Sequence, residues 1–455
     1  MISAIKKIIS MQDLKTKILY TIFLLLVCRV GAFIPVPGIN QEAALALFKQ
    51  ATGGGQNLFQ LMDIFSGGAF AQLTIIALGI MPYISASIIM QLLVAIVPSF
   101  QRDIKENPDT GRKKVTKYTR IATLLLCFIH SYLIARYALS MNMTHPGIVA
   151  QEMINVVAFG IPLLFYITVM ITMTTGTMFL MWLGEQITEK GIGNGTSLII
   201  TVGILASLPS TIGSLIKQLN LESQEVGQLT FTSLIVLAVV FISIIIGTIL
   251  VIQGQRKIPV QYARRTISPN EVHGGASNIG LKVNYAGVIP VIFASSFLMF
   301  VAQILQFIKK DSAFGKISSY FTPGSWVYLS AYVLLILFFT FFWTSTQFNP
   351  DQIASEMKKN GAFIPGIRQG KPTQDFLEGT MNKITLIGGI ILALIAILPA
   401  LVSKIIGVDQ RIAHFFGGTS LLILVGVILD TSKQIESHLL TKKYEGFMKK
   451  GNIRG

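Results

Sequence analysis

Residues 58–70 read LFQLMDIFSGGAF, an apolar stretch that is too short to cross a membrane. A membrane-spanning helix needs about 20 predominantly apolar residues, because its backbone polar groups must be satisfied within the segment. This stretch stops at Ser66, Gly67 and Gly68, and an unbroken apolar run follows it directly. The sequence therefore predicts a short helix that ends in a glycine hinge beside a spanning helix.

The rest of the chain has the composition of a polytopic membrane protein. Of its 455 residues 52% are hydrophobic and 13% are charged, and the mean hydropathy is +0.64. These values lie far from those of ordinary soluble domains. Ten apolar segments have spanning length, near 18–36, 72–97, 119–140, 153–182, 196–216, 229–253, 285–308, 326–346, 384–404 and 414–432.

The first apolar segment has some features of a signal peptide, because lysines precede it. It is long, however, contains Arg29, and continues into FIPVPGIN without a small-residue cleavage pattern. These features favour a retained membrane helix over a cleaved leader.

The distribution of basic residues predicts the orientation of the chain. The net charge is +16, and 28 of the 37 lysines and arginines fall on one side of a ten-span topology. Basic residues accumulate on the cytoplasmic side of membrane proteins. Both termini are therefore expected in the cytoplasm.

Two of the predicted cytoplasmic loops are longer than the topology requires. The loop near 254–284 contains GQRKIPVQYARR, and the loop near 347–383 contains MKKNGAFIPGIRQGKPT. Their charge alone would serve to fix orientation and to attract anionic lipid. Their length and their mixture of Arg, Pro, Gly and aromatic residues instead favour docking onto a large partner.

The sequence offers no arrangement of residues for a catalytic site or a cofactor. The five histidines are scattered without an HExxH motif, and no acidic pair recurs at a catalytic spacing. GIGNG at 191–195 lies between two spans, which favours a tight loop over a phosphate-binding site. The chain is predicted not to be an enzyme and to need no cofactor.

A secondary transporter of small solutes is the alternative function for ten spans with Gly and Pro interruptions. Ion-coupled transporters place ionisable residues at membrane depth. Here Asp63 lies in the short broken segment and Asp430 near the end of the last span. The scarcity of acidic residues in the spans disfavours the transporter.

Two features within the spans are open to both a structural and a functional interpretation. Isoleucines four residues apart, Ile80 with Ile84 and Ile200 with Ile204, share a helix face, which ordinary helix packing explains. Polar side chains in the second and seventh spans suit hydrogen bonding between helices as well as a seam that opens. They include Ser87, Gln91, Ser295 and Ser296.

Seven motifs, taken together, resemble the SecY family, the channel subunits of bacterial protein translocases. They are RVGAFIPVPGI, FSGGAF with IIALGIMPYISASIIMQLL, MWLGEQITEKGIGNG, GQRKIPVQYARR, KVNYAGVIPVIFASS, FNPDQIASEMKKNGAFIPGIR and FFGGTSLLILVGVILD. The resemblance runs from about residue 14 to residue 435, with the motifs in the family's order.

The resemblance implies an all-α polytopic membrane protein with ten transmembrane helices around an hourglass pore. Two pseudo-symmetric halves of five helices would cover 18–217 and 218–435, between a cytoplasmic segment 1–17 and a cytoplasmic tail 436–455. The pore would pass unfolded secretory chains across the membrane, and it would open sideways to release signal sequences and transmembrane helices into lipid.

The resemblance also assigns roles to residues of this sequence. The pore ring would consist of Ile80, Ile84, Ile200, Ile204, Ile292 and Ile423. The plug would contain Leu61, Met62, Asp63, Ile64, Phe65, Ser66, Gly67 and Gly68. The lateral gate would include Ser87, Gln91, Ser295 and Ser296. The contact surface for SecA or the ribosome would include Arg256, Lys257, Arg264, Arg265, Lys358, Lys359 and Arg368.

The partners implied are an obligatory SecE, an accessory SecG, the SecA ATPase and the ribosome, with SecDF and YidC as further partners. Secretory and membrane proteins would be the clients, in the bacterial cytoplasmic membrane and in contact with its lipids. Nucleic acid would be met only as ribosomal RNA. Gln369 and Phe376 depart from the family's frequent proline and tyrosine, which affects the expected details of SecA contact.

Overall fold

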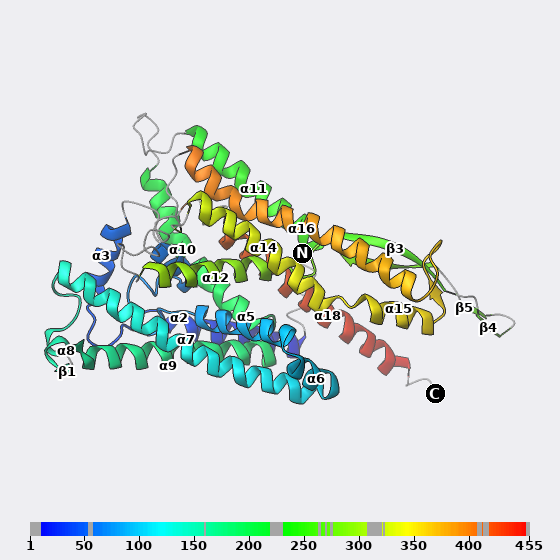
Figure 1. The fold of residues 1–455 in the computed structure, drawn as a ribbon, viewed down its shortest axis with the longest axis horizontal. Helices are drawn as coiled ribbons and strands as arrows, with labels where there is room; N and C mark the ends of the chain where they lie inside the picture. The colour runs from blue at the N-terminus through cyan, green and yellow to red at the C-terminus, as the bar shows by residue number, and fades with distance from the viewer. Residues whose placement is uncertain are drawn as a thin grey trace.

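The protein is an elongated bundle in which long helices lie alongside one another, as the computed structural model shows (Figure 1). The structure describes residues 11–52, 58–158, 161–218, 231–262, 265–268, 271–273, 276–306, 321, 324–406, 412 and 418–451. A helix overlaps each of the ten predicted spans. The prediction of a helical membrane protein with many apolar spans is confirmed.

The long helices fall into two sets by position in the sequence. The first set is α2 (Gln12–Gly31), α5 (Met81–Ile96), α7 (Pro108–Thr144), α9 (Leu163–Lys190) and α10 (Gly195–Gln218). The second set is α11 (Phe231–Gln253), α12 (Ile289–Gln306), α14 (Trp326–Gln347), α16 (Lys371–Ile406) and α18 (Thr419–Gly451). Shorter helices are α3 (Gln41–Thr52), α4 (Leu58–Ser66), α6 (Pro98–Glu106), α8 (Gln151–Asn155) and α15 (Pro350–Lys359).

Within the described residues, six helical segments are long and apolar enough to cross a membrane. They are Pro108–Thr144, Leu163–Lys190, Gly195–Ile216, Thr232–Gln253, Trp326–Lys359 and Lys371–Val402. The pair α5 and α6 passes the same test together, with a bend of 92° between its parts, and Ile289–Leu305 is a shorter apolar helix.

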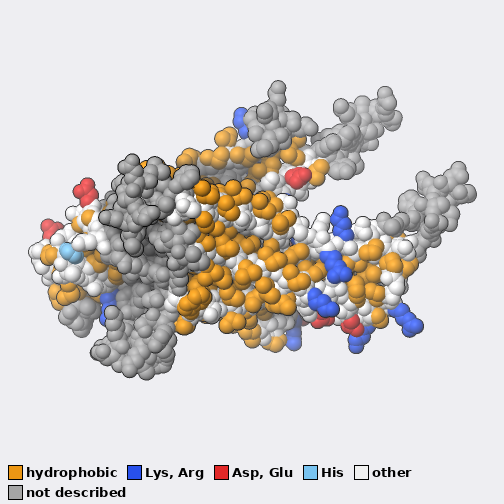
Figure 2. All heavy atoms as spheres, turned by 90° about the horizontal axis from the view of Figure 1, so that it is seen from above, with side chains coloured by type: hydrophobic (Ala, Val, Ile, Leu, Met, Phe, Trp, Pro, Cys, Tyr) orange, Lys and Arg blue, Asp and Glu red, His pale blue; other side chains and the backbone are white. Residues whose placement is uncertain are grey.

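The surface of the bundle is apolar over its middle, as expected where lipid replaces water. Figure 2 shows hydrophobic side chains over the middle of one face, with lysines and arginines gathered toward the end at the right. On α11, Ile246 and Leu250 are 53% and 66% exposed. Continuous apolar surface of this kind is rare on soluble monomers, so these side chains face the membrane.

The second and fourth predicted spans begin later than the hydropathy indicates. Residues 72–80 form turns, with positive φ at Leu73 and Gly79, and the helix begins at Met81 with Pro82 in its first turn. Before α9, the strands β1 (Val157–Ala158) and β2 (Ile161–Pro162) form an antiparallel pair. Apolar composition alone does not distinguish a spanning helix from a turn or a short strand.

Three helices extend more than ten residues beyond the predicted spans. The sequence places span starts near 119 and 384, whereas α7 begins at Pro108 and α16 at Lys371. The last predicted span ends near 432, but α18 continues to Gly451. The segment predicted as a tail from 436 therefore continues α18 as far as Gly451. Hydropathy marks only the apolar part of a longer helix.

The predicted loop near 254–284 is largely β-hairpin. Strand β3 (Gln255–Tyr262) pairs antiparallel with β6 (Ala276–Lys282) and, at its end, with β7 (Ala362–Phe363). Strands β4 (Arg265–Ser268) and β5 (Glu271–His273) form a further antiparallel pair between β3 and β6 (Figure 1). The β-branched side chains Ile258 and Val260 alternate with exposed neighbours and are buried, which explains the strand.

The described residues form three clusters of buried apolar side chains, of which the largest and the one beside the hairpin are described here. The largest cluster draws on both sets of long helices, which meet where α5 contacts α12 and α10 contacts α18. The cluster beside the hairpin packs Ile258, Val260 and Leu281 of the hairpin against Met357 of α15 and Leu377 of α16. The hairpin is thus fixed to the second set of helices.

Candidate functional site

Six isoleucines from separate segments are buried together in the largest cluster. Ile80 lies directly before α5, Ile84 lies on α5, and Ile200 and Ile204 lie on α10. Ile292 is on α12 and Ile423 on α18, so both sets of helices contribute. Each is at most 6% exposed, and all six belong to one contiguous cluster. The residues predicted as a pore ring are therefore brought into one apolar region.

The short helix α4 packs into this same cluster. At nine residues and about 1.5 Å per residue it is far too short to cross a membrane. Its side chains Met62 and Phe65 are 5% and 8% exposed and belong to the isoleucine cluster. Ile64 is also buried, whereas Asp63 is half-buried; Leu61 lies on α4, and its side chain is outside the described part.

Phe65 stands between two small apolar cavities, each of about 30 Å³. Ile80, Ile200 and Gly203 line the first, and Ser295, Met299 and Tyr332 are among the residues that line the second. A volume of this size holds roughly two water molecules. At this position Phe65 borders helices of both sets, with little space on either side.

The turn after α4 is a compact structure held by its own hydrogen bonds. The Asp63 carbonyl accepts from the Gly68 amide at 3.0 Å and from the Ser66 hydroxyl at 3.1 Å. The Asp63 carboxylate accepts from the Ala71 amide at 2.8 Å. Gly67 and Gly68 have φ of +67° and +88°, a region that favours glycine. Asp63 therefore caps the turn, a role that its apolar setting did not reveal in the sequence.

The turn is also tied to α2. Arg29 Nη1 donates a hydrogen bond of 2.7 Å to the Gly67 carbonyl oxygen. Sequence reasoning used Arg29 only as an argument against a signal peptide and missed this contact. The visible signal was a single arginine inside an apolar run, because a charge at membrane depth is rarely retained without a partner.

The polar residues predicted for a lateral gate lie on two helices that contact each other, α5 and α12. Gln91 donates to the Ser87 hydroxyl at 3.1 Å within α5, and Ser295 and Ser296 both donate to the Ile292 carbonyl within α12. Across the two helices, the Ser296 hydroxyl approaches Met81 Sδ at 3.9 Å.

Ser295 and Ser296 thus do not form the expected hydrogen bonds between these two helices. Their hydroxyls bond within their own helix, as serine in membrane helices commonly does. The Gln91 side-chain oxygen is buried without a hydrogen-bond partner among the described residues. The contact between α5 and α12 depends mainly on apolar packing.

The basic residues predicted as a partner surface lie on or near the hairpin and α15. Arg256 and Lys257 are exposed on β3, and Lys358 and Lys359 are exposed at the end of α15. Arg368 is exposed in the connection between β7 and α16, where the Gln369 side chain donates to the Ala362 carbonyl at 3.1 Å. Arg265 lies on β4, with its side chain outside the described part, and Arg264 lies outside the described residues.

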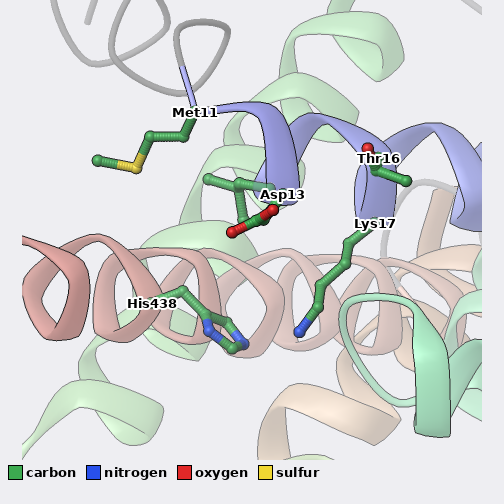
Figure 3. A pocket seen from close by; sticks show the side chains of 6 residues that line it. Met11, Asp13, Thr16, Lys17 and His438 are labelled. Carbon is green, nitrogen blue, oxygen red and sulfur yellow. The ribbon is translucent and has the colours of Figure 1, made fainter.

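A further hollow lies between the first turns of α2 and the later part of α18 (Figure 3). Met11, Asp13, Thr16 and Lys17 line one side, and His438 lines the other; its volume is about 430 Å³. Neither of the cavities beside Phe65 shares a residue with it. The hollow is therefore separate from the isoleucine cluster.

These features define a class: a multi-pass helical membrane protein in which a short helix, followed by a glycine turn, packs into the main apolar cluster. The SecY family profile matches residues 74–432. The protein translocase subunit SecY of Chlamydia muridarum is 57% identical over 454 residues, which cover 100% of this chain and 99% of the relative. The chain belongs to the SecY family.

Solved structures agree with this fold. One, of a SecY whose plug domain is described as stabilising the closed state of the translocation channel and maintaining a membrane seal, superimposes with a TM-score of 0.59 and 19% identity. It covers 92% of this chain and 91% of the other. Another, Sec61 in a canine ribosome-channel complex from the endoplasmic reticulum, has a TM-score of 0.56 at 17% identity, with 92% and 91% covered.

The protein is thus a protein-conducting channel of the Sec translocase, a transport protein and not an enzyme, as the sequence predicts. The alternative of a small-solute transporter is excluded by the family.

Proposed function

We propose that the six isoleucines form the constriction of the pore and that α4 with its glycine turn is the plug. The observation that carries this proposal is the burial of Met62 and Phe65 of α4 in the same cluster as all six isoleucines. The solved SecY whose plug domain stabilises the closed state has the same fold, which supports the proposal.

A constriction of branched apolar side chains suits the passage of an unfolded protein. It expels water and so obstructs ions, but it offers a translocating chain no fixed hydrogen-bond partners. Phe65 fills the space between the two helix sets until a chain displaces it. No chemical step is needed in this chain, so the driving energy comes from a partner.

Lateral release requires that two halves of the molecule separate. We propose that the halves are residues 18–217 and 218–435 and that the gate lies between α5 and α12. Most close helix contacts lie within each set, while α5 with α12 and α10 with α18 join them. A seam of small apolar contacts with one weak hydroxyl–sulfur contact opens more readily than a seam of strong hydrogen bonds. A signal helix then partitions into lipid because lipid is its better solvent.

The basic hairpin end is proposed to face the cytoplasm, together with both termini, in the bacterial cytoplasmic membrane. Its exposed cations Arg256, Lys257 and Arg368 suit carboxylates of SecA or phosphates of ribosomal RNA. The likeness in fold to Sec61 of a ribosome-channel complex supports the ribosome as one partner. SecE is proposed as the clamp of the two halves, with SecG as an accessory subunit.

The experiment that tests the pore is crosslinking of a stalled secretory chain to single cysteines. Ile84→Cys and Ile292→Cys place thiols in the constriction from α5 and α12, and Ile246→Cys places one on the exposed face of α11. We expect adducts at both constriction sites and none at residue 246. Adducts at residue 246 without adducts at residues 84 and 292 would contradict the assignment.

A further inference from the structure

The contact between Arg29 and the turn after α4 joins two segments separated by 38 residues. Arg29 lies in the last turn of α2, and its Nη1 donates to the Gly67 carbonyl oxygen at 2.7 Å. A hydrogen bond from a guanidinium is roughly twice as strong as one between neutral groups, and apolar surroundings strengthen it further. The contact is therefore strong for a single interaction between two tertiary elements.

The turn fits into a slot that admits only glycine. A Cβ at Gly67 would lie 2.9 Å from Arg29 Nη1 and 2.9 Å from Gly203 Cα on α10. In the opposite direction, a Cβ at Gly203 would lie 2.8 Å from the Phe65 carbonyl oxygen. The backbone of the turn is thus enclosed by α2 on one side and α10 on the other.

The guanidinium has three kinds of partner in this position. Beyond the Gly67 carbonyl, its central carbon lies 5.1 Å from the centre of the Phe33 ring, and the Asp63 carboxylate of α4 interacts with it electrostatically. Two of these partners belong to the segment proposed as the plug. Movement of α4 therefore deprives a half-buried cation of two of its three partners.

We propose that Arg29 is a latch that holds the plug in its closed position. The proposal rests on the proposed function of α4 as the plug and adds the residue that sets the balance between seated and displaced states. The hydrogen bond of the latch is made to a backbone carbonyl, so it depends directly on the position of the turn. A charged hydrogen bond of this kind changes the equilibrium constant between the seated and the displaced plug by roughly tenfold or more.

The test compares Arg29→Met with Arg29→Lys in planar bilayers, using the reconstituted channel with its partner subunits. Met keeps the apolar stem without donors, and Lys keeps the charge without the planar fork. Arg136→Met on α7 is the matched control, because Arg136 is exposed and lies on a helix that does not carry the latch. We expect ion leak to rise at least tenfold in R29M, less in R29K, and not at all in R136M.

A second measurement separates a released latch from general damage. In a C28A/C127A background, Phe65→Cys and Met299→Cys line one cavity and can be joined by a short cleavable crosslinker. If the latch is right, the crosslink suppresses the leak of R29M and cleavage restores it. A normal leak in R29M, or a leak that the crosslink leaves unchanged, would overturn the latch.

The same crosslink tests the plug independently of Arg29. With Arg29 intact, the crosslinked channel should pass no secretory protein until the linker is cleaved. Transport through the crosslinked channel would contradict the plug itself. Blocked transport together with a normal leak in R29M would contradict the latch alone.

Discussion

The backbone amide of Gly193 donates a hydrogen bond of 2.8 Å to Gln434 Oε1, which joins the loop between α9 and α10 to α18. The two residues lie 241 positions apart: Gly193 is in a loop between two helices of the first set, and Gln434 is on a helix of the second set. In the same loop, the Ile192 amide donates to the hydroxyl of Thr21 on α2 at 3.1 Å. The GIGNG segment is thus a structural junction, in line with the tight loop that its sequence predicts.

Replacing Gln434 by Leu should destabilise the solubilised protein, because the Gly193 amide loses its acceptor. We expect a loss of roughly 1 kcal/mol in the free energy of unfolding, the usual contribution of one such hydrogen bond. Thermal unfolding in detergent measures it. Gln434→Glu keeps an acceptor at this position and is the control; equal losses in both variants would show that the hydrogen bond is not the cause.

Replacing Ile84 and Ile204 together by Ser should make the resting channel leaky to ions. Smaller polar side chains let water enter the constriction, so conductance should rise by roughly an order of magnitude. Signal sequences of low hydrophobicity should also be accepted more readily. Planar-bilayer recordings and an export assay measure the two effects.

The control for this prediction is the double replacement of Ile84 and Ile204 by Leu. It conserves apolar volume and should leave the seal nearly intact. A serine variant that conducts no more than the leucine variant would argue against the pore assignment.

Replacing Arg368 by Ala should reduce SecA-dependent export without unfolding the protein. The side chain is exposed, so the fold loses little, whereas a lost charged contact to a partner weakens binding roughly tenfold. Export into vesicles and binding of SecA to them provide the two measurements.

Arg112→Ala is the control for Arg368, because Arg112 is also exposed but lies on α7, outside the two predicted contact loops. Export at the normal rate in R368A, or an equal defect in R112A, would contradict a specific role for Arg368.

The ion pair of Arg120 with Glu185 should contribute to stability, whereas that of Lys114 with Asp103 should not. Arg120 on α7 binds both carboxylate oxygens of Glu185 on α9, at 3.2 and 2.7 Å, and the Glu185 side chain is only 19% exposed. The Lys114–Asp103 pair is a single contact between side chains that are 52% and 41% exposed.

We therefore expect Glu185→Gln to lower the free energy of unfolding by roughly 1–2 kcal/mol and Asp103→Asn to change it by less than about 0.5 kcal/mol. Both losses are measured by thermal unfolding at low and high salt. Similar effects in the two variants would mean that the two hydrogen bonds of Arg120 add no more to the free energy of unfolding than a single exposed contact does.

The spans were predictable because a membrane imposes one simple requirement on sequence, a long apolar run. The same requirement misplaces the start of the second span. Residues 72–80 are as apolar as a helix, yet their backbone finds partners elsewhere: Val36 donates to the Leu73 carbonyl, and Ile75 donates to the Ile34 carbonyl. Such partners depend on how the chain folds back, and hydropathy holds no information on them.

The hairpin carried a local signal that its charge concealed. Ile258 and Val260 alternate with exposed residues, the period of a half-buried strand, but the run is short, basic and interrupted by Pro259. The segment near 254–284 is therefore predicted as a loop from the sequence. The register of β3 against β6 pairs residues on either side of a long connection, and no local pattern specifies it.

The candidate site also has a part that the sequence predicts and a part that it does not. The isoleucine pairs and the glycine hinge are each visible within a single stretch of sequence. The contact of Arg29 with Gly67 and the close approach of Gly67 to Gly203 unite three segments, so they emerge only in three dimensions.

The hairpin has a mechanical consequence that follows from its attachment. Gly254 is the only residue between the end of α11 and the start of β3, and its carbonyl accepts from the Val283 amide at 2.9 Å, which extends the ladder to the base of the hairpin. The base of the hairpin is therefore joined directly to α11, with no flexible linker between them. A force applied to β3 and β6 would therefore act on α11 and, through the short connection after β6, on α12, which carries Ile292 of the proposed constriction and Ser296 of the proposed gate.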